Sequence, residues 1–337
     1  MNFSISLAFF FCLTLMTSAQ AESRKIVILE TMPIPVIKEH SKAIKQSLAE
    51  LEAKTGDTYE IEILEGMGAK DRAVKLLKKS LEKKRPDLVV TIATLATQAA
   101  KEVLSGSNIP ILFCVVIDPI GAGIIKKVGV ASGTNITGVV YTQQHNTKVE
   151  MVMRLLRHTH RDSVLKIGFI GSDYPSSISD LRTLEKISAR ADDFEFVTYI
   201  YPYRPIPEGL PEMFANMRKG VDSIKDKVDF FWEGSGPMSE IVEASQILID
   251  SGKPVILGYT PKAVEMGILM AVVTDYQETG RQVVEMADKV FQGTDVGTIP
   301  VTTPRKFNLY LNMKTAEKYG LKIPSHLLMI AGENIFP

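Results

Sequence analysis

Cysteine is scarce in this chain of 337 residues, which contains only Cys12 and Cys114. Cys12 lies in an apolar N-terminal segment that we expect to be removed, so a disulfide within the mature chain is excluded. Cys114 lies inside the apolar run Ile111–Ile117, where a small core residue is the simplest interpretation.

The chain also lacks an excess of charge of either sign. Its 39 lysines and arginines balance 39 aspartates and glutamates, so we expect neither a nucleic acid nor an acidic membrane surface as partner. Beyond the N-terminal segment, no run of residues is long and uncharged enough to span a bilayer.

Motifs of common enzymes are missing as well. Gly121-Ala122-Gly123 lacks the third glycine of a dinucleotide-binding loop, and Ser235 lies in Glu-Gly-Ser-Gly-Pro rather than in a nucleophile elbow. The five histidines are scattered, and His158 and His160 are typical of a polar helix end rather than of a metal site. We therefore expect no catalytic residue, no metal and no cofactor.

The N-terminus has the pattern of an export signal. Ile5–Met16 is apolar but short for a membrane span, and Ala19-Gln20-Ala21 fits the small-x-small rule for cleavage. No lysine or arginine follows Met1, so the usual positive region is absent. The pattern favours a signal peptide over residues 1–21, cleavage after Ala21 and a periplasmic protein; an uncleaved anchor is the alternative.

From Arg24 onward, strand and helix patterns alternate, which predicts parallel strands joined by right-handed crossovers. The series pauses in a polar stretch near Ser132–Gly138 and then restarts, which predicts two α/β lobes. The expected strands are Lys25–Glu30, Tyr59–Glu65, Leu88–Ile92 and Ile111–Val115, then Lys166–Ile170, Phe194–Tyr199, Val228–Trp232 and Pro254–Gly258.

The C-terminal part is too small for a third domain. It holds an expected strand at Ile268–Val273, an amphipathic helix at Tyr276–Gln292, and a final strand at Lys306–Leu311. These pieces should complete the two sheets, so the chain must cross between the lobes more than once.

A potential anion site follows the strand Leu88–Ile92. We expect a helix to begin there with Thr94 as N-cap, and a helix start at the carboxyl end of a parallel strand favours a carboxylate. The alternative is that Thr94 only caps its own helix.

Ligands of open α/β sheets bind beyond the carboxyl ends of the strands. The candidates at these positions are Thr31, Met32, Gly66, Thr94, Thr97 and Asp118 in the first lobe, Asp173, Tyr174, Glu233, Ser235, Tyr259 and Thr260 in the second, and Asp275 and Tyr276 after the strand 268–273. Met32, Tyr141, Tyr174, Trp232 and Tyr259 could pack on an apolar ligand body.

Several of these residues have a simpler structural explanation. Asp118 before Pro119 is a common turn pair, and Asp275 is a good cap for the helix that follows it. Trp232 ends an apolar strand and suits the core, and Glu233 precedes a Gly-Ser-Gly turn.

Four stretches in register resemble one family, the ABC-transporter substrate-binding proteins that include tryptophan- and tyrosine-type binding proteins. The stretches are Pro86–Ala100, Asp118–Gly123, Asn135–Val139, and Tyr276–Arg281 with Met286-Ala287. The resemblance runs from Lys25 to Pro324. It implies a type I periplasmic binding protein with Rossmann-like lobes, three crossovers and a cleft, lobe 1 being 22–138 with 268–297 and lobe 2 being 139–267 with 298–337.

The resemblance also implies roles in the cleft. Positions matching Thr94–Gln98, Leu95 among them, receive a ligand carboxylate, and an acidic residue receives the ammonium. Asp118, Asp173, Glu233 and Asp275 are the candidates for that acid.

The chain departs from the family pattern in the second lobe. Relatives usually carry Asp and Asn where this chain has Glu233–Gly236, and often Ser-Asp where it has Tyr259-Thr260; Leu95 replaces the usual proline. We therefore expect a ligand other than a standard aromatic amino acid.

The resemblance implies a monomeric, non-catalytic binding protein that closes around a small carboxylate-bearing ligand by hinge motion and is recognised by a membrane permease. One alternative keeps the fold but passes the ligand signal to a membrane kinase or cyclase. The other is an exported enzyme on the same scaffold.

Overall fold

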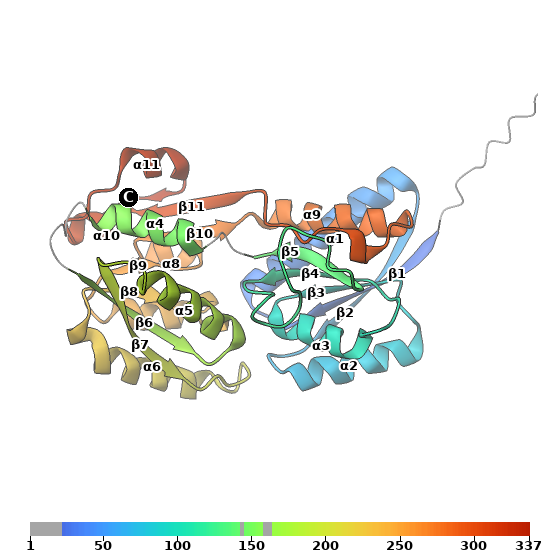
Figure 1. Cartoon of the computed structure of the whole chain (residues 1–337), viewed down its shortest axis with the longest axis horizontal. Coiled ribbons are helices and arrows are strands. Elements are labelled where there is room, and N and C mark those ends of the chain that lie inside the picture. The colour runs from blue at the N-terminus through green and yellow to red at the C-terminus, as the bar shows by residue number, and fades with distance from the viewer. Residues whose placement is uncertain (1–21, 142–144, 158–163) are drawn as a thin grey trace, which may run out of the picture.

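The computed structural model describes residues 22–141, 145–157 and 164–337, which form two α/β lobes side by side (Figure 1). The expected signal peptide and the pair His158 and His160 lie outside the described residues.

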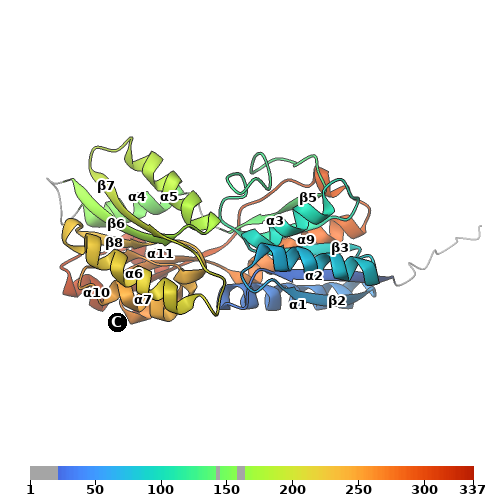
Figure 2. The same ribbon diagram turned by 90° about the horizontal axis from the view of Figure 1, so that it is seen from below.

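Lobe 1 is built on a five-stranded parallel sheet with the order β2-β1-β3-β4-β5. β3 and β4 are buried at every position, as apolar strands are when helices cover both faces. Helices α1 and α9 pack together on one face, and α2 and α3 pack together on the other (Figures 1 and 2). The elements are β1 Ser23–Glu30, α1 Pro35–Thr55, β2 Thr58–Glu65, α2 Lys70–Lys83, β3 Leu88–Ile92, α3 Thr94–Leu104, β4 Ile111–Val116, β5 Ile136–Val140 and α9 Tyr276–Phe291.

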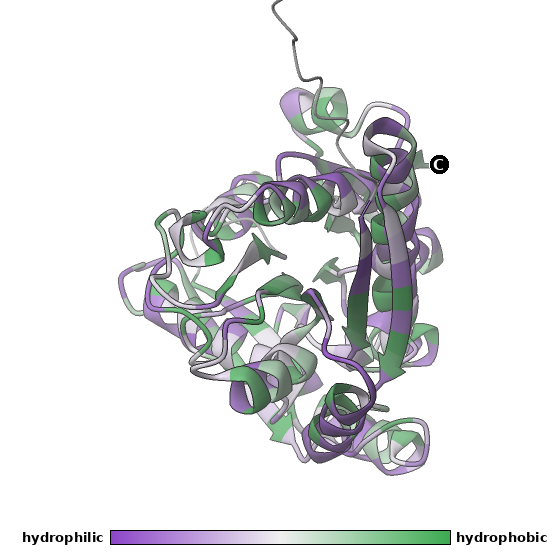
Figure 3. Ribbon diagram, turned by 90° about the vertical axis from the view of Figure 1, so that its right-hand side faces the viewer, coloured by the Kyte–Doolittle hydropathy of each residue, from purple (hydrophilic) through white to green (hydrophobic). Residues whose placement is uncertain are grey.

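Lobe 2 has a parallel sheet with the order β7-β6-β8-β9, extended by a second sheet with the order β10-β11-β12. Colouring by hydropathy, seen with lobe 1 toward the viewer, shows hydrophilic and hydrophobic segments on both the helices and the strands (Figure 3). The elements are α4 His145–Leu156, β6 Leu165–Ser172, α5 Pro175–Ser188, β7 Phe194–Tyr201, α6 Leu210–Ile224, η1 Lys225–Lys227, β8 Phe230–Glu233, η2 Pro237–Glu240, α7 Val242–Ile249, β9 Val255–Leu257, α8 Pro261–Met266, β10 Met270–Thr274, β11 Phe307–Asn312, α10 Met313–Lys318, α11 Ser325–Ala331 and β12 Ile335–Phe336. The short helix η3 Val296–Thr298 contacts β5 and belongs to lobe 1.

Strand β10 differs from the expected division of the chain, which placed 268–297 in lobe 1. It pairs antiparallel with β11, and a bridge between Gly258 and Ala271 joins it to the end of β9. Only the following helix, α9, returns to lobe 1, where it packs on α1. The buried run of β10 specifies a strand covered on both faces but not the sheet it joins, because its partner lies further along the chain.

The two other expected boundaries are each displaced by a few residues. Val139 and Val140 belong to β5, and bridges from Pro300 to Ala131 and from Thr302 to Val139 keep the segment after η3 on lobe 1. The chain therefore passes between the lobes three times: from β5 to α4, from β10 to α9, and between Thr302 and β11. Three crossovers and two parallel sheets are the architecture that the family resemblance implied.

Candidate functional site: a cleft between the lobes

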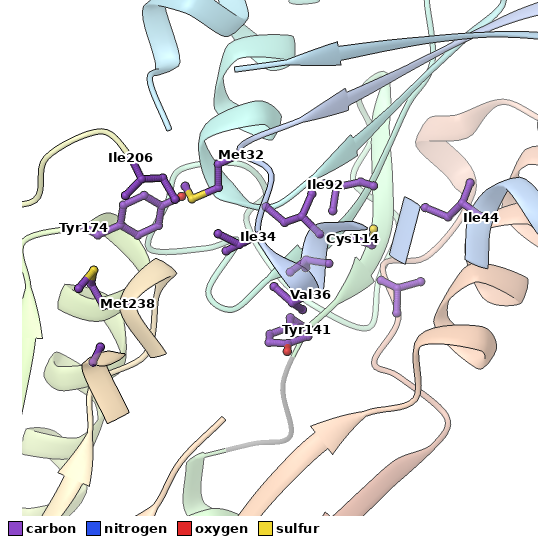
Figure 4. Packing of buried hydrophobic residues seen from close by; sticks show 14 of the residues in the cluster. Met32, Ile34, Val36, Ile44, Ile92, Cys114, Tyr141, Tyr174, Ile206 and Met238 are labelled. Carbon is purple, nitrogen blue, oxygen red and sulfur yellow. The ribbon is translucent and has the colours of Figure 1, made fainter. Parts of the chain in front are cut away.

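A cleft lies between the lobes at the carboxyl ends of both parallel sheets. The space between its walls, counted together with the solvent at its mouth, is about 440 Å³. Figure 4 shows Met32, Ile34 and Tyr141 on the lobe 1 side and Tyr174 and Met238 on the lobe 2 side. The lining residues are Met32, Ile34, Val36, Ile37, Ala93, Thr94, Val115, Ile117 and Tyr141 from lobe 1, and Tyr174, Ser176, Gly236, Pro237, Ser239, Glu240 and Tyr259 from lobe 2.

The lobe 1 wall of the cleft is largely apolar. The turn after β1 and the first turn of α1 supply one methionine and three branched aliphatic residues, and the end of β4 adds Val115 and Ile117. Pro35 begins α1 at its N1 position, which orients the neighbouring Ile34 and Val36 toward the cleft (Figure 4). This wall can pack on an apolar ligand body.

The start of α3 is the polar part of the lobe 1 wall. The sequence predicted Thr94 as the N-cap, and this was wrong: Thr94 is the first residue of the helix. The cap position is Ala93, whose side chain accepts no hydrogen bond. The Thr94 side chain is thus not used in capping, and it lines the cleft. Thr94 therefore lies where the helix dipole favours an anion.

Two threonines expected in the site instead hold the start of α3 in place. The Thr97 hydroxyl bonds to the Thr91 hydroxyl at 2.9 Å and donates to the Ala93 carbonyl at 2.9 Å. The Thr31 hydroxyl donates to the Ile92 carbonyl and accepts from the Ala96 N–H at 3.0 Å. Both side chains are buried and neither lines the cleft.

Backbone conformations that L-residues rarely adopt occur twice in this wall. Ala93 has φ of 73° and Val115 has φ of 58°. Ala93 directly follows β3, and Val115 is the next-to-last residue of the neighbouring strand β4. Such conformations cost on the order of 1–3 kcal/mol each and concentrate at functional sites. A register shift between β4 and β5 in this region accompanies the change at Val115.

The lobe 2 wall is polar and comes from three segments that follow strands β6, β8 and β9. The end of the loop after β6 and the first turn of α5 supply Tyr174 and Ser176, the segment around η2 supplies Ser239 and Glu240, and the loop after β9 supplies Tyr259. Hydroxyl, carboxyl and aromatic groups therefore face the aliphatic wall of lobe 1.

Tyr259 is fixed by a buried polar network beneath the lobe 2 wall. Its hydroxyl donates to Asp180 Oδ2 at 2.7 Å, and the other carboxylate oxygen shares a hydrogen bond with His145 Nε2. The Lys148 ammonium lies 5.1 Å from the centroid of the Tyr259 ring. Burial opposes the charged form of Asp180, but the hydrogen bond from His145 and the charges of His145 and Lys148 hold the pKa of Asp180 below its ordinary value.

Two carboxyl groups of lobe 2 have raised pKa values. Burial raises the pKa of Glu233 to about 8, against hydrogen bonds from Ser245 and from the Tyr259 backbone. Burial and the neighbouring Glu233 raise the pKa of Glu240 to about 8. Glu233 lies behind the cleft, where it accepts the Ser245 hydroxyl at 2.7 Å, whereas Glu240 lines the cleft.

Polar contacts join the two lobes along the edge of the cleft. The Tyr203 hydroxyl donates to the Gly68 carbonyl at 3.3 Å, and the Ser179 hydroxyl donates to the Asp118 carboxylate. The Leu95 backbone hydrogen-bonds with the Tyr174 hydroxyl, which partly offsets the effect of burial on the Tyr174 pKa. Asp118 also accepts the N–H groups of Ile120 and Gly121, as a turn residue does.

The residues expected to bind ligand therefore divide into two groups. Met32, Thr94, Tyr141, Tyr174 and Tyr259 line the cleft, whereas Thr31, Leu95, Thr97, Asp118, Asp173, Glu233, Ser235 and Asp275 do not.

Asp173, Ser235 and Asp275 have other hydrogen-bond partners. Asp173 accepts the Tyr203 N–H at 2.6 Å, and the Ser235 hydroxyl donates to the Ser176 carbonyl. Asp275 caps α9 and pairs with Lys306 at 2.8 Å. It follows β10, a lobe 2 strand, so it does not end a strand of the lobe 1 sheet.

Sequence reasoning missed Glu240, Ser176, Ser239 and most of the aliphatic wall. Glu240 lies seven residues beyond Glu233, the end of β8, and η2 turns the chain back toward the cleft. The only available signal was Gly236-Pro237, a turn pair that allows such a reversal.

Neither a membrane-spanning helix nor a metal centre is found in the described parts of the chain. None of the helices there has the length and apolar character needed to cross a membrane. No three His, Cys, Asp or Glu side chains within residues 22–141, 145–157 and 164–337 are placed to share a metal ion.

Two parallel-sheet lobes with a cleft between them define the type I periplasmic binding fold, and solved structures of that class resemble this one. The chain belongs to the family of ABC transporter substrate-binding proteins, since the family model matches residues 25–335.

Individual relatives are distant in sequence but cover nearly the whole chain. A tyrosine-binding protein of Clostridioides difficile is 22% identical over 305 residues, 89% of this chain and 82% of the relative. An ABC domain from Streptococcus pneumoniae in complex with L-Trp has a TM-score of 0.76 at 24% identity, covering 94% of this chain and 100% of that one. A conserved domain protein from Vibrio cholerae has a TM-score of 0.75 at 22% identity, covering 93% and 99%.

Proposed function

We propose that this chain is an exported, non-catalytic solute-binding protein of an ABC importer. It holds a small carboxylate-bearing molecule, an amino acid or a related compound, between its lobes and closes on it by hinge motion. A membrane permease then recognises the closed monomer. The N-terminal 21 residues act as the signal peptide that brings the chain to the periplasm.

The observation that carries the proposal is the position of Thr94. It begins α3 at the carboxyl end of β3, its side chain is not used in capping, and it lies in an otherwise apolar wall along which an apolar ligand body can pack. The family membership and the relatives that bind tyrosine or hold L-Trp support an amino-acid-like ligand.

A thermal-shift screen of the mature chain against amino acids, keto acids, nucleosides and small peptides tests the proposal. A carboxylate compound should raise the unfolding midpoint in a concentration-dependent way. Stabilisation by neutral compounds alone would contradict it, and turnover of a stabilising compound would contradict the non-catalytic part.

The variant Thr94→Val sharpens this test, with Thr294→Val, an exposed threonine beyond α9, as the matched control. Thr94→Val should weaken binding of the stabilising carboxylate about tenfold, the usual value of one hydrogen bond to a charged group, and Thr294→Val should leave it unchanged.

A further inference from the structure

Glu240 is a carboxyl group in the cleft that pairs with no cationic side chain of the described residues. It ends η2 and is only partly exposed, and no ion pair found in the described parts of the chain includes it. Among the described residues that line the cleft there is no lysine, arginine or histidine. A carboxylate in such surroundings is costly unless a cation or hydrogen-bond donor approaches it.

A second carboxyl group lies near Glu240. Glu233 lies close enough to raise the pKa of Glu240, and the charge of Glu240 in turn contributes to the raised pKa values of Tyr141 and Tyr276. The titratable groups that these couplings place near Glu240 are another carboxyl and two phenols, and none of them carries a positive charge.

The rings beside Glu240 also favour a cation. Tyr141 and Tyr259 line the same cleft, and the face of a tyrosine ring attracts an ammonium group. The Lys148 ammonium already lies 5.1 Å from the centroid of the Tyr259 ring, so this ring attracts a second cation less strongly. Tyr141 packs edge-on against His40, whose burial lowers its pKa to about 4 and keeps it neutral, so no positive charge opposes a cation there.

We infer that Glu240 receives a cationic nitrogen of the ligand, with the Tyr141 ring beside it, so that the ligand is an amine with an apolar body. The inference rests on the proposed function and names the residue that binds the amine group of the ligand. Glu240 takes the place of Asp118, Asp173, Glu233 and Asp275, which the structure engages in other contacts or buries behind the cleft. The carboxylate site at Thr94 and the amine site at Glu240 then lie on opposite walls.

Two matched sets of compounds test the inference by calorimetry. One set is L-tryptophan, tryptamine and indole-3-propionate; the other is L-leucine, 3-methylbutylamine and 4-methylpentanoate. Within a set the apolar body is constant, and only the amine or the carboxylate is removed. The variants are Glu240→Gln and, as a control, Glu243→Gln, an exposed glutamate on α7.

In at least one set, the unmodified protein should bind the amino acid at least about 30-fold more tightly than the deaminated acid. Glu240→Gln should reduce that ratio to about threefold or less by weakening the amino acid alone, and Glu243→Gln should preserve it. Unchanged binding of the deaminated acid by Glu240→Gln shows that the variant is folded.

Equal binding of the amino acid and the deaminated acid by the unmodified protein would overturn the inference and leave the proposed function standing. An unchanged ratio in Glu240→Gln would overturn the role of Glu240. Binding of the amines with no requirement for the carboxylate would support the inference and contradict the carboxylate part of the proposed function. Failure of all six compounds to bind would contradict both.

Discussion

The two walls of the cleft differ in chemistry and in how they are held. The lobe 1 wall is apolar apart from Thr94 and the Tyr141 hydroxyl, and it rests directly on the ends of buried strands. The lobe 2 wall carries hydroxyl, carboxyl and phenol groups on loops, backed by the network of Asp180, His145 and Tyr259. An apolar wall can accept many ligand bodies of similar size, whereas a polar wall rejects a ligand that leaves its groups unpaired. We therefore expect lobe 2 to determine specificity.

The largest predicted effect comes from breaking the polar network of lobe 2. Asp180→Ala leaves the Tyr259 hydroxyl, His145 and the buried Lys148 without their common partner. Removing one partner of a buried charged network costs about 3–5 kcal/mol in free energy of unfolding. Urea denaturation measures this, and Asp192→Ala, an exposed aspartate after α5, should stay within about 0.5 kcal/mol of the unmodified protein. A similar small loss for Asp180→Ala would show that the network does not support the wall.

Truncation of the aliphatic wall should have the next largest effect. Ile37 is 1% exposed and lines the cleft, so Ile37→Ala removes packing atoms and leaves a cavity, at a cost of about 2–4 kcal/mol. Ile330→Ala on α11, where the side chain is 62% exposed, is the matched control and should cost less than about 0.5 kcal/mol. Ile37→Ala should also weaken binding of the amino acid and its deaminated acid by the same factor, because the apolar body is common to both. Unequal factors would contradict the division of roles between the walls.

The stability of the unoccupied protein should fall as the pH rises from about 5 to about 8. A carboxyl group with a raised pKa binds its proton more tightly in the folded than in the unfolded chain. The stabilisation that comes from this bound proton is therefore fully present below the ordinary pKa of 4.5. It is lost as the pH approaches about 8, the pKa of Glu233 in the folded chain. Each unit of difference corresponds to about 1.4 kcal/mol.

Glu233→Gln removes one of the titrating groups and should flatten this decline by more than about 1.4 kcal/mol between pH 5 and pH 8. Glu243→Gln, an exposed glutamate, should keep the decline of the unmodified protein. Identical pH profiles of the free energy of unfolding for Glu233→Gln and the unmodified protein would show that Glu233 is not held in its neutral form.

The smallest predicted effect concerns the positive φ at the start of α3. Ala93→Gly relieves a backbone conformation that costs an L-residue about 1 kcal/mol. Glycine also gives the unfolded chain more conformational freedom, which destabilises the folded state by a similar amount. The free energy of unfolding should therefore change by less than about 0.5 kcal/mol. Ala99→Gly, within the same helix, has no such relief and should cost about 1 kcal/mol or more. Equal losses in thermal or chemical denaturation would contradict the strain at Ala93.

Much of the fold was predictable because its strands are short buried runs between amphipathic helices. The runs at Leu88–Ile92 and Ile111–Val115 match β3 and β4 closely, since parallel strands covered on both faces have few other patterns. The sheet joined by β10 was not predictable, because antiparallel pairing with β11 depends on a partner far along the chain. The boundaries at Val139 and Thr302 depend on equally distant bridges.

The site was predictable only in part from the rule that ligands bind beyond the strand ends, since Thr31 and Asp173 directly follow strands and do not line the cleft. Tyr174 and Tyr259 follow β6 and β9 and line the cleft, as positions beyond strand ends should. The rule could not say whether Thr97 faces the cleft or its own helix, since that depends on the Thr91 hydroxyl. It also missed Glu240, because the return of the chain through η2 is a tertiary feature.

The central claim is that both walls contact one ligand, and hydrogen exchange read by mass spectrometry tests it most directly. The mature chain is compared with and without a compound that stabilises it in the thermal screen. The account predicts slower exchange in the loop 31–37 and the start of α3 in lobe 1, together with 174–177 and 236–240 in lobe 2. Protection confined to one lobe, or located away from these segments, would contradict it.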